Sequence, residues 1–161
     1  MRLLAALCVA LAFFGSVATP SGASPAGTAT PVVKPLKQVL PKVPTAPAAL
    51  ALVRTTLIAV DHGNKTGNYT VLRDMAAPSF RNANNASKLG SIFANLVAQR
   101  VDMLPVLVVE PAYREQPRLT AQRMLYIAGR FDIRPRPVSF ELLFEVVKGE
   151  WQLYGVSIVP G

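Results

Sequence analysis

The amino-acid sequence predicts an α+β domain in which three N-terminal helices pack on one face of a curved, mainly antiparallel, four-stranded sheet. Two observations lead to this fold class. Apolar residues recur at helical spacing only in the first part of the domain, between residues 46 and 97. Residues 106–159 instead form apolar or alternating runs separated by turn-forming residues, as strands do. Helices followed by strands are typical of domains whose helices cover one sheet face.

The first helix is predicted at the start of the domain. Thr45 is of a type that caps helix N-termini, and Pro47 would fall in the first turn, where its missing N–H costs little. Gly63 predicts the end of the helix, because glycine readily adopts the left-handed conformation found there. The expected apolar stripe consists of Leu50, Leu52, Val53, Leu57, Ile58 and Val60.

Two more helices are predicted before the strands. The second covers about residues 67–76 and is stopped by Pro78, which cannot continue a helix. The third begins at Asn84 or Asn85, since asparagine is a good N-cap. The residues expected to face inward are Val71, Leu72 and Met75 in the second helix, and Leu89, Ile92, Phe93, Leu96 and Val97 in the third.

Four strands are predicted over residues 106–110, 118–131, 138–147 and 151–159. A two-residue turn at Lys148 and Gly149 joins the last two strands. The expected cross-strand pairs are then Val146 with Trp151, Phe144 with Leu153, Leu142 with Gly155, and Phe140 with Ser157. The opposite, outer face is expected to carry Ser139, Glu141, Leu143, Glu145, Gln152, Tyr154, Val156 and Ile158.

The residues that precede the domain predict export. Arg2, a short apolar run and small residues that allow cleavage after Ala18 or Ala23 form the pattern of a secretory signal peptide over residues 1–23. Residues 24–45 are rich in Pro, Ala, Thr and Lys, a composition typical of an extended, semi-rigid linker. The domain is therefore assigned to residues 46–161, and a periplasmic or secreted location is expected.

Charge and cysteine content disfavour several functions. The formal net charge is +8, but the basic residues are spread along the chain instead of forming a stripe, so nucleic-acid binding is not expected. A weak attraction to an anionic membrane surface is a better use of this charge. Cys8, the one cysteine, lies in the signal peptide, which leaves the mature chain without disulfides or thiolate ligands. With His62 as the one histidine, no metal site and no cofactor are expected.

Three segments resemble a known superfamily. They read TVLRDMAAPSFR (residues 70–81), IAGRF (127–131) and VSFELLFEVVKGEWQLYGVSIVP (138–160). Together with the order of elements, they resemble the cystatin-like, cone-shaped α+β superfamily that includes nuclear transport factor 2 and ketosteroid isomerase. More narrowly, the chain is similar to small exported bacterial members without an assigned activity. The resemblance implies a cone whose interior can hold a ligand, and a homodimer formed through the outer side of the sheet.

Two sets of residues are candidates for function. The ligand-pocket candidates inside the cone are Leu89, Phe93, Arg123, Leu125, Phe140, Phe144 and Trp151. The interface candidates on the outer face are Met124, Tyr126, Leu143 and Tyr154. Arg123 shares strand parity with Leu125, which would place it on the core face, either reaching solvent at the end of the sheet or selecting a ligand at a pocket mouth. An apolar stripe rimmed by charges is typical of a protein interface.

Other polar residues are considered for chemistry without being assigned any. Asp61 next to His62 could act as a general base, but a cationic histidine also suits a helix C-terminus. Tyr69 and Arg73 are spaced to share a helix face, where they form either an exposed stacked pair or the cover of a cavity. Asp74 is expected to bind a backbone amide or a nearby arginine. No catalytic residue is assigned.

The sequence therefore favours an exported, non-catalytic module. It would bind a small apolar or amphipathic ligand inside the cone, or pair with itself or another envelope protein. The alternative is an enzyme of the isomerase or hydratase type, with acid and base residues inside the cone.

Overall fold

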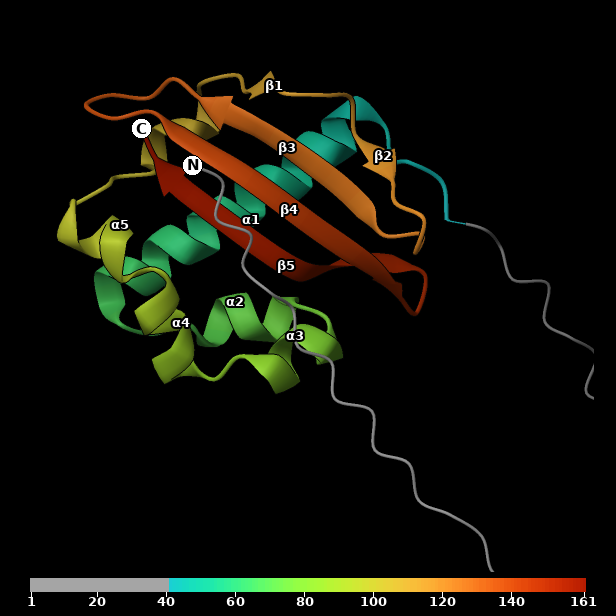
Figure 1. The fold of residues 1–161 in the computed structure, drawn as a ribbon, viewed down its shortest axis with the longest axis horizontal. Helices are drawn as coiled ribbons and strands as arrows, with labels where there is room; N and C mark the ends of the chain where they lie inside the picture. The colour runs from blue at the N-terminus through green and yellow to red at the C-terminus, as the bar shows by residue number, and fades with distance from the viewer. Residues whose placement is uncertain (1–40) are drawn as a thin grey trace, which may run out of the picture. The chain divides into compact units, whose positions relative to one another are not determined.

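The computed structural model describes residues 41–161. The predicted signal peptide and most of the predicted linker lie outside the described residues. The helices are α1 (Ala46–Thr66), α2 (Thr70–Met75), α3 (Pro78–Ala83), α4 (Ala86–Ile92), α5 (Ala94–Ala98) and the 3-10 helix η1 (Leu104–Leu107). The strands are β1 (Ala112–Tyr113), β2 (Arg118–Leu119), β3 (Leu125–Phe131), β4 (Val138–Val147) and β5 (Glu150–Pro160). The α+β class is confirmed (Figure 1).

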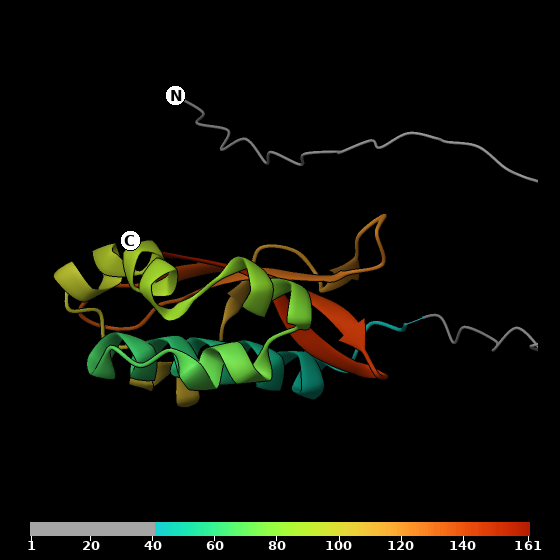
Figure 2. The same cartoon turned by 90° about the horizontal axis from the view of Figure 1, so that it is seen from below.

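The five strands form one antiparallel sheet. Strand β4 lies between β3 and β5, while the short strands β1 and β2 both pair with the free side of β3 (Figure 1). Figure 2 shows α1 and α2 together in a layer on one side of this sheet. The junction between α2 and α3 runs along the edge of β5, where the Ala77 N–H donates to the Leu153 carbonyl at 2.9 Å.

Helix α1 begins after Thr45, as predicted, but continues beyond the predicted end at Gly63. Gly67 closes the helix instead, with a left-handed φ of 72°, and its N–H bonds the Gly63 carbonyl. Gly63 has a packing role: a Cβ there would lie 2.4 Å from Cδ1 of Tyr69. The glycine is therefore needed inside the helix because an aromatic ring covers that position.

The segment after α1 breaks into more helices than predicted. Pro78 follows the end of α2, and it also occupies the first turn of α3. Asn85 is an N-cap, as predicted, and its side chain accepts a hydrogen bond from the Lys88 N–H at 2.8 Å. The third predicted helix is interrupted at Phe93 and continues as α5.

This interruption changes which side chains face inward. Leu72, Leu89, Phe93 and Leu96 are buried, as predicted. The prediction was wrong for Val71, Met75, Ile92 and Val97, which are all exposed. The break at Phe93 shifts the helical phase, so one uninterrupted helical period cannot describe both Ile92 and Val97. Val71 and Met75 lie in α2, before this break.

Two strand predictions were wrong. The apolar run at 106–110 contains no strand and overlaps η1. The predicted strand over 118–131 is a hairpin, since β2 and β3 are separated by a turn in which the Thr120 N–H donates to the Met124 carbonyl. Arg123 lies in this turn with a left-handed φ of 61° and is exposed. Its predicted place on the core face is therefore wrong, whereas the predicted alternative, in which it reaches solvent at the end of the sheet, agrees with this position.

The β4–β5 hairpin follows the predicted turn. Lys148 and Gly149 both have positive φ (53° and 91°), as a primed two-residue turn requires. The pairs Val146 with Trp151 and Phe144 with Leu153 are confirmed.

A bulge changes the register further along this hairpin. Leu142 pairs with Val156 and Phe140 with Ile158, so their predicted partners were wrong. As a consequence, Val156 and Ile158 pack against the core, and their predicted place on the outer face was also wrong.

The core is one cluster that joins α1 to the sheet. Helix α1 contributes Ala49, Val53, Leu57 and Val60, and the strands contribute Leu125, Ile127, Phe131, Phe140, Leu142 and Phe144. Each of these side chains is almost completely buried. Burial of an aliphatic or aromatic side chain contributes about 1.5–3 kcal/mol, so this cluster is the main source of stability.

We predict opposite effects for two glycine substitutions. Gly63→Ala should lower the free energy of unfolding by about 1–3 kcal/mol, because the new methyl group meets the buried Tyr69 ring. Gly90→Ala should raise it by about 0.5–1 kcal/mol, because the nearest atom to the new Cβ is 3.9 Å away and alanine favours the helix. Denaturant unfolding measures both values. Equal effects of the two variants would contradict the packing role of Gly63.

Candidate functional site

An open apolar groove of about 320 Å³ lies on the face of α1 that points away from the core. We call it the α1 groove. Its lining residues are Ala51, Arg54, Thr55, Ile58, Ala59, His62, Val71, Met75 and Leu107. Helix α1 forms the floor, α2 forms one wall with Val71 and Met75, and η1 forms the other wall with Leu107.

The composition of α1 explains why the floor is apolar. Among its 21 residues, the charged ones are Arg54, Asp61 and Lys65. All three interact with the segment around η1, and Arg54 also lines the groove. The exposed residues of the floor, Ala51, Thr55 and His62, therefore add little charge to the groove.

The walls of the groove expose large apolar side chains. Val71 is 60% exposed and Leu107 51%. Val108, which follows η1 but is not a lining residue, is 83% exposed. Met75 and Leu104 are also exposed. Single exposed apolar residues are ordinary, but a group of them around a groove marks an interaction site.

Arg54 fixes one end of the η1 wall. Its Nε donates to the Val106 carbonyl at 2.9 Å, and Nη2 donates to the Val109 carbonyl at 3.0 Å. The same Nη2 pairs with Glu110 at 2.9 Å. The planar guanidinium can serve several acceptors at once, so one side chain satisfies carbonyls that the short helix leaves free.

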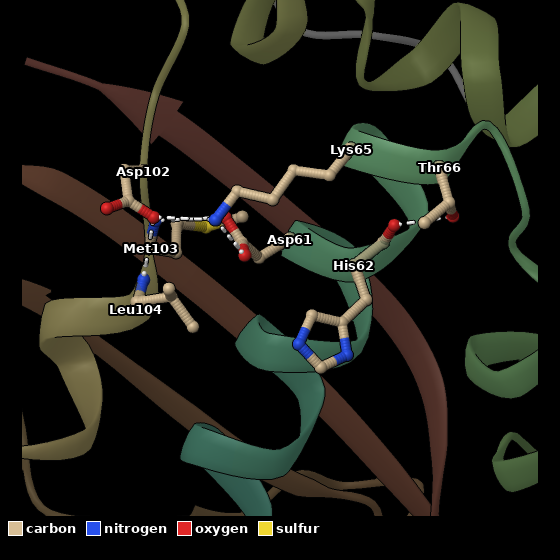
Figure 3. A network of polar contacts seen from close by, with 7 residues as sticks. All are labelled: Asp61, His62, Lys65, Thr66, Asp102, Met103 and Leu104. Carbon is tan, nitrogen blue, oxygen red and sulfur yellow. Dashed lines mark hydrogen bonds and ion pairs between the residues drawn. The ribbon is translucent and has the colours of Figure 1, made fainter.

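A second polar network fixes the other end of this wall (Figure 3). Asp61 is 1% exposed, and its Oδ1 accepts a hydrogen bond from the Met103 N–H at 3.0 Å. Its Oδ2 lies 2.7 Å from Lys65 Nζ, an ion-pair distance without hydrogen-bond alignment. Lys65 also donates to Asp102 Oδ1 at 2.7 Å. The ammonium thus bridges two carboxylates, one buried and one exposed.

The network shifts the pKa of two of its members. Partial burial opposes the charge of Lys65, but its contacts with Asp102 and Asp61 outweigh this and raise its pKa above the usual value. The hydrogen bond from Lys65, together with the Leu104 N–H, lowers the pKa of Asp102. Both shifts favour the charged forms of Lys65 and Asp102.

Asp61 and His62 do not form a carboxylate–imidazole pair that could act as a general base. Neighbouring residues on a helix point in different directions, and Figure 3 shows the imidazole directed away from the Asp61 carboxylate. Asp61 instead serves Met103 and Lys65, while His62 is exposed and lines the α1 groove. The helix C-terminus that was expected beside His62 lies further along the chain.

Tyr69 and Arg73 are not an exposed pair. The Tyr69 ring is buried and stacks on Phe93 with centroids 5.9 Å apart, and its hydroxyl donates to Asn64 Oδ1 at 2.8 Å. Burial raises the pKa of this phenol. Arg73 instead donates to the Asn84 carbonyl at 2.9 Å. These side chains hold α2 to the helices that follow it.

The ligand-pocket candidates fall into three places. Leu89, Phe93, Leu125, Phe140 and Phe144 are at most 2% exposed and belong to the packed core. Trp151 is half-buried and, with Phe144, lines a shallow cavity of about 70 Å³ beside α1 and α2. Arg123 is separated from them in the β2–β3 turn. A cavity of 70 Å³ is much smaller than the ~300–1,000 Å³ of typical ligand pockets.

The interface candidates lie mostly on the outer sheet face. Tyr126 pairs with Leu143 across β3 and β4, and the Arg118 guanidinium lies 4.9 Å from the Tyr126 ring centroid. Leu143 is half-buried against Gly155, and Tyr154 is exposed at the bulge.

Charged side chains around these residues pair with one another, as Arg114 does with Glu141 and Arg118 with Glu115. Met124 is half-buried at the β2–β3 turn. The outer face is thus more polar than the α1 groove.

Other kinds of site find little support in residues 41–161. No group of three or more His, Cys, Asp or Glu side chains in this part could hold a metal ion. None of its helices is both long and apolar enough to span a membrane. No family model, curated protein or solved structure matches the chain.

The sequence analysis did not find the α1 groove. The available signal was the scarcity of charge in α1, which the search for one core-facing stripe did not consider. The walls of the groove could not be predicted, because Val71 and Met75 were expected to face inward and the η1 segment was expected to be a strand.

We predict that Arg54→Lys loosens the η1 wall. Lysine cannot reproduce the fork that binds two carbonyls, so the free energy of unfolding should fall by about 1–2 kcal/mol. Amide hydrogen exchange of residues 104–110 should become faster. The control is Arg118→Lys, since that guanidinium pairs with Glu115 at the surface and its loss should change stability by less than about 1 kcal/mol. Equal losses of unfolding free energy in both variants would refute the role of Arg54 in fixing the η1 wall.

We predict that Asp102 contributes stability in a defined pH range. Its folded-state pKa is lowered, so its contribution is present above the unfolded value of 3.8 and is lost as pH falls through the folded value. The difference in unfolding free energy between the natural chain and Asp102→Asn should therefore be constant above about pH 5 and shrink below pH 3.8. Urea titrations at several pH values measure it. A difference that does not change with acid would contradict the Lys65–Asp102 bond.

Proposed function

We propose that this chain is an exported, non-catalytic protein-interaction module that works through the α1 groove. One observation carries the proposal: the groove gathers exposed Val71, Met75 and Leu107 on a rigid scaffold, whereas the side chains expected to bind a ligand are packed together in the core. Exposed apolar side chains around a groove are the usual mark of a surface that a partner covers.

The packed interior favours a protein partner over a small ligand. The side chains of Phe93, Phe140 and Phe144 contact other core residues, and the cavity that touches Phe144 is about 70 Å³ in volume. The α1 groove is larger, but it is open along α1 and lined mainly by apolar atoms. A groove of this kind fits a helix or ridge of another protein.

The isomerase or hydratase alternative has less support. It requires an acid or base inside the fold. Within residues 41–161, the buried carboxylate is Asp61, and its oxygens are already engaged by Met103 and Lys65. Asp61 therefore has a structural role in holding the η1 wall.

Several expectations from the sequence belong to this proposal. They are membership of the cone-shaped superfamily, with its N-terminal helices on one face of a curved sheet, and cleavage of a signal peptide near Ala18 or Ala23. Homodimer formation through Tyr126, Leu143 and Tyr154, and a weak attraction to anionic membranes, also stay predictions. Export would place the groove where envelope proteins can reach it.

A crosslinking experiment in the producing cells tests the proposal. A photo-activatable amino acid at Thr55 on the groove floor should give a defined protein adduct, and so should one at Leu107 on its wall. The matched control is Ser157, which is exposed on β5 outside the groove and should give none. Adducts at Ser157 but not at Thr55 or Leu107 would refute the α1 groove as the contact surface.

Native mass spectrometry of the chain purified from its host tests the choice of partner. The packed core predicts a polypeptide mass without a retained small molecule. A co-purifying ligand of constant mass would contradict the interaction module and restore the ligand-binding alternative.

A further inference from the structure

We propose that the β3–β4 loop, residues 132–137, is part of a binding site for a phosphate monoester group, either free in solution or carried on a lipid headgroup. The loop follows Phe131, at the opposite end of β3 from the β2–β3 turn (Figure 1). The site shares no lining residue with the α1 groove, so the inference goes beyond the proposed function and does not depend on it.

An open pocket of about 210 Å³ lies at this loop, and we call it the loop pocket. Its lining residues are Arg130, Asp132, Ile133, Arg134, Pro135 and Pro137. Ile133 is 3% exposed and packs in the core, which anchors the loop to the domain. Small ligands bind in concave sites where a few polar or charged groups fix their orientation, and the loop pocket has this form.

One arginine of the loop pocket is already oriented. The Nε of Arg130 donates to Asp132 Oδ1 at 2.6 Å. A guanidinium has five N–H donors, and this bond uses one of them. Both partners are open to solvent, with 52% of the Arg130 side chain and 68% of the Asp132 side chain exposed. The two Nη atoms of Arg130 can therefore donate to an anion in the pocket while Asp132 holds the guanidinium in place.

The other arginines of the loop have no acidic partner. Arg134 lines the loop pocket, Arg136 lies two residues further on, and both are exposed. Neither takes part in an ion pair within residues 41–161. By contrast, Arg114 and Arg118 each pair with a glutamate. The loop thus presents positive charge that the described part of the chain does not neutralise.

The charge of the loop favours a phosphate monoester over other anions. Residues 130–137 contain three arginines and one aspartate, which gives a net charge of +2. A phosphate monoester carries a charge of about −1.5 to −2 at neutral pH and would balance this surplus. A carboxylate or a phosphodiester carries a single negative charge and would leave the loop positive. The planar fork of a guanidinium also matches two oxygens of a phosphate group.

Two prolines limit the conformations of the loop before it binds. Pro135 and Pro137 flank Arg136, and each proline ring fixes its own φ at about −65°. The Pro137 carbonyl accepts a hydrogen bond from the Gly161 N–H at 2.8 Å, which ties the loop to the residue that follows β5. A restricted loop loses less entropy on binding than a mobile one, so part of the cost of ordering the site is avoided.

Titration of the purified chain with inorganic phosphate tests the inference. Nuclear magnetic resonance spectra, recorded while phosphate replaces chloride at constant ionic strength, should show saturable shifts centred on residues 130–137. A dissociation constant of about 1 mM is expected, because exposed charges contribute little each. Arg134→Gln should raise this constant at least about fivefold, since a charged donor to the phosphate is lost.

Two control variants remove the same charge elsewhere. Arg123→Gln changes an exposed arginine in the β2–β3 turn and should leave the dissociation constant unchanged. Arg136→Gln removes a charge from the loop without removing a side chain that lines the pocket, so its effect should be smaller than that of Arg134→Gln. Circular dichroism checks that each variant is folded. Equal effects of all three variants would indicate a general attraction of anions and would overturn the site.

Lipid vesicles distinguish the two sources of the phosphate group. Phosphatidylcholine vesicles that contain phosphatidic acid present a monoester, whereas those that contain phosphatidylglycerol present a diester. Co-sedimentation with the first kind that is reduced by Arg134→Gln would assign the site to a lipid headgroup. Saturable phosphate shifts without vesicle binding would assign it to a free phosphorylated molecule.

Two further results would overturn the inference. One is the absence of saturable shifts at phosphate concentrations up to about 10 mM. The other is equal binding to both kinds of vesicle that does not change in Arg134→Gln. Neither result bears on the proposed function, because the crosslinks at Thr55 and Leu107 probe a different surface.

Discussion

Helix α1 is packed against the sheet through Val53, Leu57 and Val60, and the rest of the domain is arranged around this contact. The helix also contacts α2, α5 and η1, which follow it in the chain and flank it in space. Because the inner stripe of α1 is completely buried, the orientation of the helix is determined, and its opposite face must point outward. The α1 groove lies on this outward face, where Ala51, Thr55 and His62 are exposed.

Polar interactions hold the η1 segment in place beside the outward face of α1. The segment around η1 has too few residues to satisfy its own backbone groups, so it depends on side chains of α1 for partners. Arg54 supplies donors to two carbonyls, and Asp61 accepts from the Met103 N–H. Lys65 compensates the charge of the buried Asp61 carboxylate, which would otherwise be costly. The charged residues of α1 thus hold the η1 wall in place, and Arg54 also lines the groove.

The outer sheet face and the α1 groove differ in whether their exposed side chains have partners within the domain. On the outer sheet face, Arg114 in the β1–β2 loop pairs with Glu141 of β4, and Arg118 pairs with Glu115 and lies over the Tyr126 ring. At the α1 groove, Val71, Leu107 and Val108 have no such cover within residues 41–161. An apolar side chain gains stability by leaving water, and nothing in the described part of the chain provides this for these three side chains. This contrast is the physical reason to look for function at the groove.

The sequence by itself determined the features that depend on local chemistry. The start of α1 after Thr45, the cap at Asn85 and the turn at Lys148–Gly149 follow from side-chain and glycine preferences that neighbours in space do not override. Tertiary structure decided the features that depend on a partner element. The Tyr69 ring requires glycine at position 63, and Arg54 fixes the conformation around Val106. The bulge determines the register of β5 against β4. Short apolar runs fit a strand or a helix equally well, and only packing against α1 selects between them.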